Sequence, residues 1–69
     1  MELCINGTSR RFSEAPPETL ADLMTTLEIT ETRGVAVAIN DQVIPRRRWS
    51  EQPLQPGDRV EIIRATQGG

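Results

Sequence analysis

The sequence predicts a single α+β domain in which one helix packs across a mixed sheet of about five strands. The chain has 69 residues, which is enough for one small core and no more. Its apolar residues predict several short strands but only one helix, in the order strand, strand, helix, strand, strand, strand. The apolar stripe of the helix must face the sheet, because nothing else in the chain could cover it.

The first two strands form a hairpin. Residues 1–6 alternate between apolar and other side chains, and Asn6-Gly7 is a strong turn signal because both residues tolerate a positive φ. The second strand runs to about Phe12, whose ring can cover one end of the core. Pro16-Pro17 then ends the hairpin, since proline prevents regular strand pairing.

The single helix begins at a capping box. The Thr19 side chain would cap the first amides of the helix, and the Asp22 side chain, at the third helical position, would form the reciprocal hydrogen bond of the box. Apolar residues follow at helical spacing and give one stripe, formed by Leu20, Leu23, Met24 and Leu27. Gly34 closes the loop after the helix.

Three more strands follow the helix. Residues 35–39 are rich in β-branched side chains, and Asn40-Asp41 turns the chain into a short return strand that Pro45 stops. Trp49 and Leu54 are apolar anchors in an otherwise polar connection. The last strand begins at Arg59, after a Pro-Gly-Asp turn, and ends near residue 65.

The predicted domain organisation is a folded unit over residues 1–64 and a flexible C-terminal tail over residues 65–69. The tail has no apolar periodicity, and its last two residues, Gly68 and Gly69, lack any side chain that could pack. The segment is therefore expected to stay apart from the core.

Composition narrows the classes of function. The net charge of −2 gives no electrostatic signature of a nucleic-acid partner. The absence of histidine excludes a Ser-His or Cys-His nucleophile pair and leaves a metal site only carboxylates. The single cysteine, Cys4, cannot form an internal disulfide, and the sequence shows neither a signal peptide nor a membrane span. We expect a cytoplasmic protein with no membrane partner, no bound metal and no enzyme activity of its own.

The candidate functional group is the terminal carboxylate of Gly69. A free carboxylate is a poor electrophile, so it must be activated, typically as an acyl-adenylate inside a site closed to water. Glycine enters a narrow channel best because it has no Cβ. Five extended residues span about 17 Å, which would let Thr66, Gln67 and Gly68 carry Gly69 into a partner while the domain stays outside. The alternative is that the Gly-Gly end is an idle terminus.

Strand alternation predicts a docking patch. It places the main apolar side chains toward the helix and leaves small or apolar residues on the opposite, open face, namely Cys4, Ala36, Ala38, Ile63 and Ala65. If the last strand lies between the first and the third, these residues are neighbours and form an exposed apolar patch that partners cover. The alternative is that small residues are simply tolerated at these positions.

Two stretches of the sequence resemble signatures of the ThiS family of thiamine sulfur carriers. The first is Ile39-Asn40-Asp41-Gln42-Val43-Ile44-Pro45-Arg46 followed by Trp49, and the second is Pro56-Gly57-Asp58-Arg59-Val60-Glu61-Ile62-Ile63 followed by Ala65 and Gly68-Gly69. The hairpin and the helix also match the layout of the family. The resemblance covers essentially the whole chain and implies a β-grasp, ubiquitin-like fold with the last strand in the centre of the sheet.

The resemblance also implies a chemical cycle. An E1-like, ThiF-like adenylating enzyme would activate Gly69 with ATP and Mg²⁺, which belong to the partner, so no cofactor is expected on this chain. A persulfide donor would then supply sulfur to give a C-terminal thiocarboxylate. A ThiG-like thiazole synthase would use that sulfur to form the thiazole of thiamine, and the carrier would return as the carboxylate.

Three alternatives stay open on the sequence alone. A molybdopterin synthase small subunit shares the tail chemistry, although the spacing of Asn40, Pro45-Arg46 and Trp49 favours the thiamine branch. A ubiquitin-like interaction module would leave the tail idle. A nucleic-acid binder would depend on the Arg46–Arg48 run, which a solvated loop explains equally well, and Trp49 is better explained as a core anchor than as a stacking platform.

Overall fold

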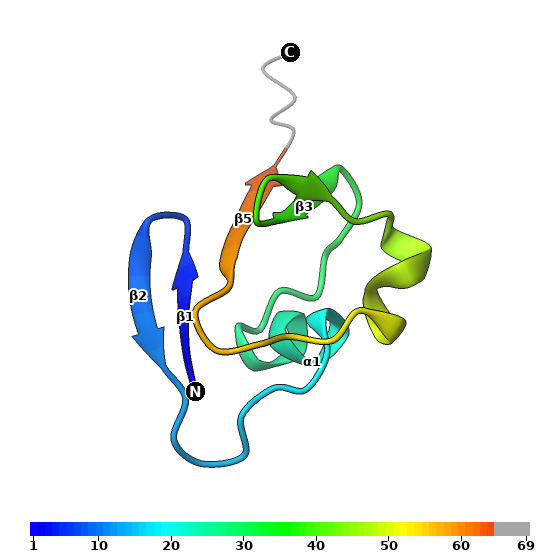
Figure 1. The fold of residues 1–69 in the computed structure, drawn as a ribbon. Coiled ribbons are helices and arrows are strands. Elements are labelled where there is room, and N and C mark those ends of the chain that lie inside the picture. Colours follow the sequence, from blue (N-terminus) through cyan, green and yellow to red (C-terminus); the bar gives the residue numbers. More distant parts are fainter. Residues whose placement is uncertain (65–69) are drawn as a thin grey trace.

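The structure is a computed structural model that describes residues 1–64, in which five strands, one α-helix and one 3₁₀-helix are present (Figure 1). The elements are β1 (Glu2–Ile5), β2 (Thr8–Arg11), α1 (Leu20–Thr26), β3 (Val35–Ile39), β4 (Gln42–Val43), η1 (Arg46–Glu51) and β5 (Arg59–Arg64). The predicted α+β class and the order of the strands and α1 are confirmed. The predicted tail, residues 65–69, lies outside the described residues.

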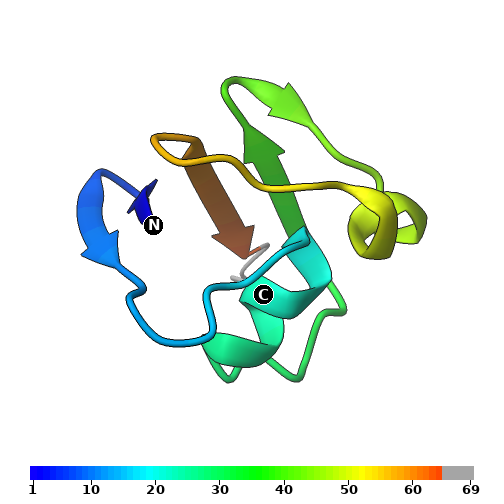
Figure 2. The same ribbon diagram turned by 60° about the horizontal axis from the view of Figure 1, so that its bottom comes forward.

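The five strands form one mixed sheet in the order β2-β1-β5-β3-β4. β5 runs parallel to β1 and antiparallel to β3, and the two hairpins are antiparallel. α1 lies across one face of the sheet (Figure 2). This is the β-grasp arrangement that the family resemblance implies, with the last strand in the centre.

Both hairpin turns use two residues with positive φ. Asn6 and Gly7 have φ of 50° and 82°, and Asn40 and Asp41 have φ of 51° and 72°. This geometry matches the right-handed twist of the strands, so a two-residue loop can reverse the chain without splaying them. Both turns occur where the sequence predicts them.

The capping box at the start of α1 is also confirmed. The Thr19 Oγ1 accepts a hydrogen bond from the Asp22 backbone N–H at 3.2 Å, and the Asp22 Oδ2 accepts one from the Thr19 N–H at 3.3 Å. Two amides at the start of the helix, which have no carbonyl partner within it, are thereby satisfied.

The end of α1 is a Schellman motif that the sequence analysis did not identify. The Glu28 N–H donates to the Thr25 carbonyl and the Ile29 N–H to the Met24 carbonyl, both at 2.9 Å. Glu28 occupies the left-handed position of this motif, with φ of 61°. Glycine is the usual residue there because it has no Cβ, so its absence hid the motif in the sequence.

The core lies between α1 and the sheet. Its buried members come from every part of the fold: Leu3, Ile5, Phe12, Leu20, Leu23, Met24, Val37, Ile39, Trp49, Leu54 and Val60. Phe12 is buried, as expected for a ring that covers the end of the core. Trp49 is 6% exposed, and its Nε1–H donates to the Ile44 carbonyl at 2.9 Å, so its predicted role as a core anchor is confirmed.

The connection after β4, for which the sequence predicts only two apolar anchors in a polar stretch, contains a helix. Residues 46–51 form η1, which begins with a hydrogen bond from the Arg48 N–H to the Pro45 carbonyl at 2.8 Å. Only Trp49 is buried in this helix. A single apolar residue gives no periodicity, which is why the pattern analysis missed the element.

Candidate functional site

The candidate site begins where β5 ends. Arg64 is the last residue of this central strand and pairs with Val35 at the start of β3. The β1–β2 turn lies at the same end of the sheet (Figure 1). Residues 65–69 follow directly from Arg64, so the predicted reacting residue, Gly69, and the predicted tail residues Thr66, Gln67 and Gly68 lie outside the described residues, as does Ala65.

Beside this end of β5, the open face of the sheet carries an exposed apolar pair. Ile63 is 59% exposed, and its register partner on β3, Ala36, is exposed next to it. The predicted alternation is present in β5, where Val60 is buried and Ile63 is not. The structure therefore brings these two members of the predicted docking patch together.

The other two described members of the predicted patch do not belong with them. Ala38 is only 7% exposed, because its register partners on the same face, Val43 and Glu61, both have longer side chains. Cys4 pairs with Arg59 at the opposite end of β5, about 13 Å along the strand from Ile63. The expectation of one continuous patch was wrong for these residues.

Val43 is an exposed apolar residue that the sequence analysis left out of the docking patch. It is 68% exposed and lies on the open face because it pairs directly with Ala38. Extending the alternation from the third strand through the two-residue turn would have assigned this face. Val43 is separated from Ile63 by β3, so it does not extend the exposed pair.

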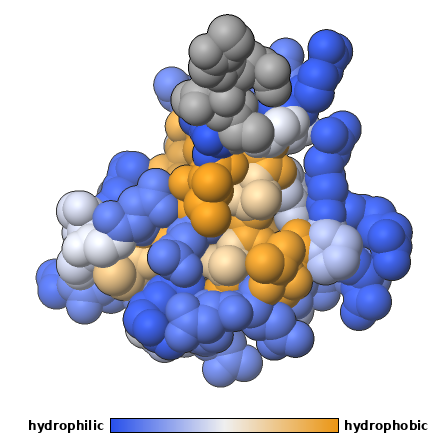
Figure 3. All heavy atoms as spheres, turned by 90° about the horizontal axis from the view of Figure 1, so that it is seen from above, coloured by the Kyte–Doolittle hydropathy of each residue, from blue (hydrophilic) through white to orange (hydrophobic). Residues whose placement is uncertain are grey.

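On the helix side, an open depression of about 430 Å³ lies beside the same end of β5. Figure 3 looks onto this end of the molecule and shows apolar side chains surrounded by hydrophilic ones. Four aliphatic residues, one asparagine and two arginines line the depression, namely Ile5, Leu27, Ile29, Ile62, Asn6, Arg10 and Arg64.

One residue that lines this depression holds β5 directly. The Asn6 Oδ1 accepts a hydrogen bond from the Ile62 N–H at 2.8 Å, and the Asn6 Nδ2 donates to the Ile62 carbonyl at 3.3 Å. The Asn6 backbone N–H donates to the Val60 carbonyl at 2.8 Å. The sequence predicts only the turn role of Asn6, since nothing local indicates a partner 56 positions away.

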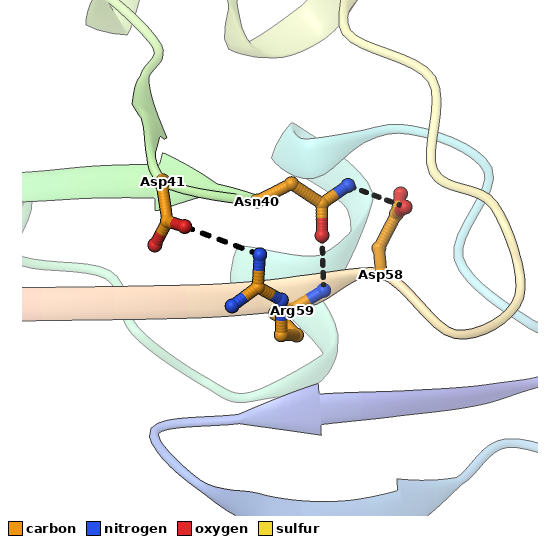
Figure 4. A network of polar contacts seen from close by, with 4 residues as sticks. All are labelled: Asn40, Asp41, Asp58 and Arg59. Atoms are coloured by element: carbon orange, nitrogen blue, oxygen red, sulfur yellow. Dashed lines mark hydrogen bonds and ion pairs between the residues drawn. The ribbon is translucent and has the colours of Figure 1, made fainter.

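A second asparagine fixes the start of β5 (Figure 4). The Asn40 Oδ1 accepts from the Arg59 N–H and its Nδ2 donates to the Asp58 Oδ1, both at 3.0 Å, while the Arg59 Nη2 lies 3.2 Å from the Asp41 Oδ2. These four residues come from the two stretches that carry the family resemblance. Their contacts explain part of that pattern as a lock between the β3–β4 turn and β5.

The arginine run lies away from the end of β5, on η1. Arg46, Arg47 and Arg48 are exposed, and Arg48 forms a solvent-exposed ion pair with Glu51 at 3.8 Å. Exposed pairs of this kind contribute little to stability. Across residues 1–64, no group of three or more His, Cys, Asp or Glu side chains could hold a metal ion, and the helices found there are too short and too polar to cross a membrane.

Comparisons with known proteins agree with this geometry. The ThiS family model matches residues 3–69. The chain is 33% identical over 55 residues to the sulfur carrier protein ThiS of Escherichia coli K12, which covers 80% of this chain and 82% of that protein. The crystal structure of the thiamine biosynthesis protein ThiS from Geobacter metallireducens superposes with a TM-score of 0.86 at 26% identity, over all of both chains.

A larger relative also matches. A thiazole synthase of Paramagnetospirillum magneticum AMB-1 is 33% identical over 69 residues, so that all of this chain corresponds to 20% of that protein. The family model, the curated carrier and the shared fold point to one assignment. This chain belongs to the ThiS family.

Proposed function

We propose that this chain carries sulfur for thiazole formation in thiamine biosynthesis, as a thiocarboxylate on Gly69. The observation that carries the proposal is the match to the ThiS family, which extends to residue 69 and so includes both glycines. The curated relatives support the same pathway, since one is a sulfur carrier protein and the other a thiazole synthase. They favour the thiamine branch over the molybdopterin alternative.

The proposed cycle begins with a ThiF-like adenylating enzyme. The Gly69 carboxylate attacks the α-phosphate of ATP, pyrophosphate leaves, and an acyl-adenylate forms. Mg²⁺ in the partner's site balances the phosphate charge. The partner must exclude water at this stage, because water would otherwise hydrolyse the anhydride.

Sulfur enters in the second half of the cycle. The terminal sulfur of a persulfide donor attacks the activated carbonyl and AMP leaves, and a thiol reduces the resulting acyl disulfide to release the thiocarboxylate. A ThiG-like thiazole synthase then consumes the sulfur. The domain acts as a co-substrate in this cycle, and its contribution is to present the tail from the end of β5.

The exposed pair Ile63 and Ala36 supports a docking role for the open face. Both lie at the end of the sheet from which residues 65–69 follow, so a partner that receives Gly69 must come close to them. Aliphatic surface that a partner covers adds affinity that does not depend on the tail. Cys4 and Ala38 are not part of this surface.

Intact-mass spectrometry tests the proposed function. The mass of the native protein first establishes that Gly69 carries the free carboxylate. Incubation with a ThiF-like enzyme, MgATP, a persulfide donor and a thiol should then replace one oxygen by sulfur, with the change confined to the C-terminal peptide. A variant that lacks Gly69 is the control and should stay unmodified. An unchanged mass in the complete reaction would contradict the proposal.

Genetic complementation tests the branch. The gene should restore growth of a thiamine auxotroph that lacks its own carrier, and the variant without Gly69 should not. Rescue of a molybdenum-cofactor mutant in place of the thiamine auxotroph would assign the chain to the other branch.

A further inference from the structure

We infer that Asn6 is a positioning residue for the tail: its side-chain amide holds the last part of β5 and thereby sets the direction in which residues 65–69 leave the domain. The inference rests on the proposed function, because the direction of the tail matters only if Gly69 must enter a partner. Nothing in the turn itself requires the contact, since the amide reaches from the β1–β2 turn to a strand at the other end of the sequence.

β1 is too short to support the whole of β5. Its register with β5 covers only Cys4↔Arg59 and Ile5↔Val60, after which the chain turns away through residues with positive φ. β5 continues for four more residues, Glu61 to Arg64, beyond this pairing. On the β1 side of β5, the backbone N–H and C=O of Ile62 would therefore lack the strand partner that a longer β1 would have provided.

The Asn6 amide takes the place of that strand partner. Its Oδ1 accepts from the Ile62 N–H at 2.8 Å and its Nδ2 donates to the Ile62 carbonyl at 3.3 Å, so the side chain satisfies one donor and one acceptor as a paired strand residue does. β3 pairs with Ile62 from the opposite side, through Val37. The end of β5 is therefore held on both sides, which restricts its pivoting with β3.

The position and exposure of the Asn6–Ile62 hydrogen bonds indicate that they affect the start of the tail more than the stability of the domain. Ile62 is two residues before Arg64, so a change in its orientation is carried directly into the start of the tail. Asn6 itself is exposed, and water competes for its hydrogen bonds, so they contribute modestly to global stability. A displacement of Arg64 shifts the point from which residues 65–69 start, and productive entry into a closed site tolerates little misplacement.

Asn40 provides a matched control. It has nearly the same φ as Asn6, 51° against 50°, stands at the same position of a two-residue turn and accepts from a β5 amide through its Oδ1. The amide it holds belongs to Arg59, at the start of the strand and far from the tail. Glycine accepts the positive φ at either position, so Asn6→Gly and Asn40→Gly each remove the amide without straining the turn.

The first measurement needs no partner enzyme. Amide hydrogen exchange should accelerate at Ile62 in Asn6→Gly and at Arg59 in Asn40→Gly. The ¹⁵N order parameters of Ile63 and Arg64 should fall in Asn6→Gly and stay at the wild-type value in Asn40→Gly. Unchanged order parameters in Asn6→Gly would overturn the inference, whether or not the chain carries sulfur.

The second measurement is pyrophosphate exchange with a ThiF-like enzyme at a temperature where all three proteins are fully folded. Asn6→Gly should raise the KM for the carrier about ten-fold with little change in kcat, whereas Asn40→Gly should change KM by less than about two-fold. Equal effects of the two variants would mean a general loss of stability and overturn positioning. If the wild-type protein is not adenylated, the proposed function fails, and the order parameters alone decide whether Asn6 holds β5.

Discussion

At the scale of single residues, positive φ values mark the places where this chain departs from ordinary backbone geometry. Among residues 1–64, five residues other than glycine have them: Asn6, Ala15, Glu28, Asn40 and Asp41. At the two asparagines the positive φ has a structural role, because each residue reverses the chain while its side-chain amide binds β5. Glu28 has no such use, since its part in the Schellman motif depends on its backbone alone.

Replacing Glu28 by glycine should stabilise the domain. Glu28→Gly removes a Cβ from a left-handed conformation and a negative charge from the C-terminal end of α1, so the free energy of unfolding should rise by about 1 kcal/mol. Urea denaturation followed by circular dichroism measures the change. Glu28→Ala removes the charge but keeps the Cβ and should gain clearly less, and an equal gain would assign the effect to charge.

Asn6 also shows how far sequence reasoning reaches at this scale. The Asn6-Gly7 pair predicts the turn because the conformational preference is local. The contact with Ile62 could not be predicted, because it depends on which strand lies beside β1 and on where β1 stops. The depression beside it was missed for the same reason, since Arg10, Leu27 and Ile62 come from three separate elements.

At the scale of elements, α1 depends on its caps because it is short. Seven helical residues make few internal hydrogen bonds, so the amides at its start need partners from outside the helix. The capping box provides them, and the apolar stripe then attaches the helix to the sheet. Both features were visible in the sequence, since both depend on residues within one turn of each other.

Thr19→Ala should lower the free energy of unfolding by about 1 kcal/mol, because the Asp22 amide loses its acceptor. Chemical denaturation measures the loss. Thr19→Ser keeps the hydroxyl and should restore most of the stability. A serine variant as unstable as the alanine variant would show that the Thr19 methyl group, and not the cap, is responsible.

η1 depends on Trp49, and here too a substitution separates two contributions. Trp49→Phe keeps an aromatic ring in the core but leaves the Ile44 carbonyl without its donor and the site underfilled, so it should cost about 2 kcal/mol. Thermal unfolding monitored by circular dichroism measures the cost. Trp49→Ala should cost more, and equal costs would mean that the ring of phenylalanine does not pack at this site.

At the scale of the whole molecule, the structure shows an exposed apolar pair, Ile63 and Ala36, at the end of β5 in place of the broad apolar patch that the sequence predicts. Alternation correctly assigned the two faces of β1, β3 and β5. It could not assign position along the sheet, because that depends on register, and the parallel pairing of β1 places Cys4 beside Arg59. The central place of β5 likewise came from family resemblance, since no local pattern distinguishes a central strand from an edge strand.

Ile63→Asp should raise the KM of the carrier for a ThiF-like enzyme about ten-fold without loss of stability, because Ile63 is exposed in the free protein and the proposed docking role places it under the partner. Pyrophosphate exchange at several carrier concentrations measures KM. Val43→Asp makes the same kind of change at an exposed apolar residue of the same face and should leave KM nearly unchanged. A similar rise in both variants would extend the docking surface to β4.

The central place of β5 has a consequence for biosynthesis. In the described sheet, β1 and β3 each pair with β5 and not with each other. A ribosome delivers both hairpins before the strand that unites them, so a nascent chain cannot complete its sheet until translation has passed Arg64. Completion of the sheet is thereby postponed until the last strand has been made, and a product terminated before β5 has no assembled domain.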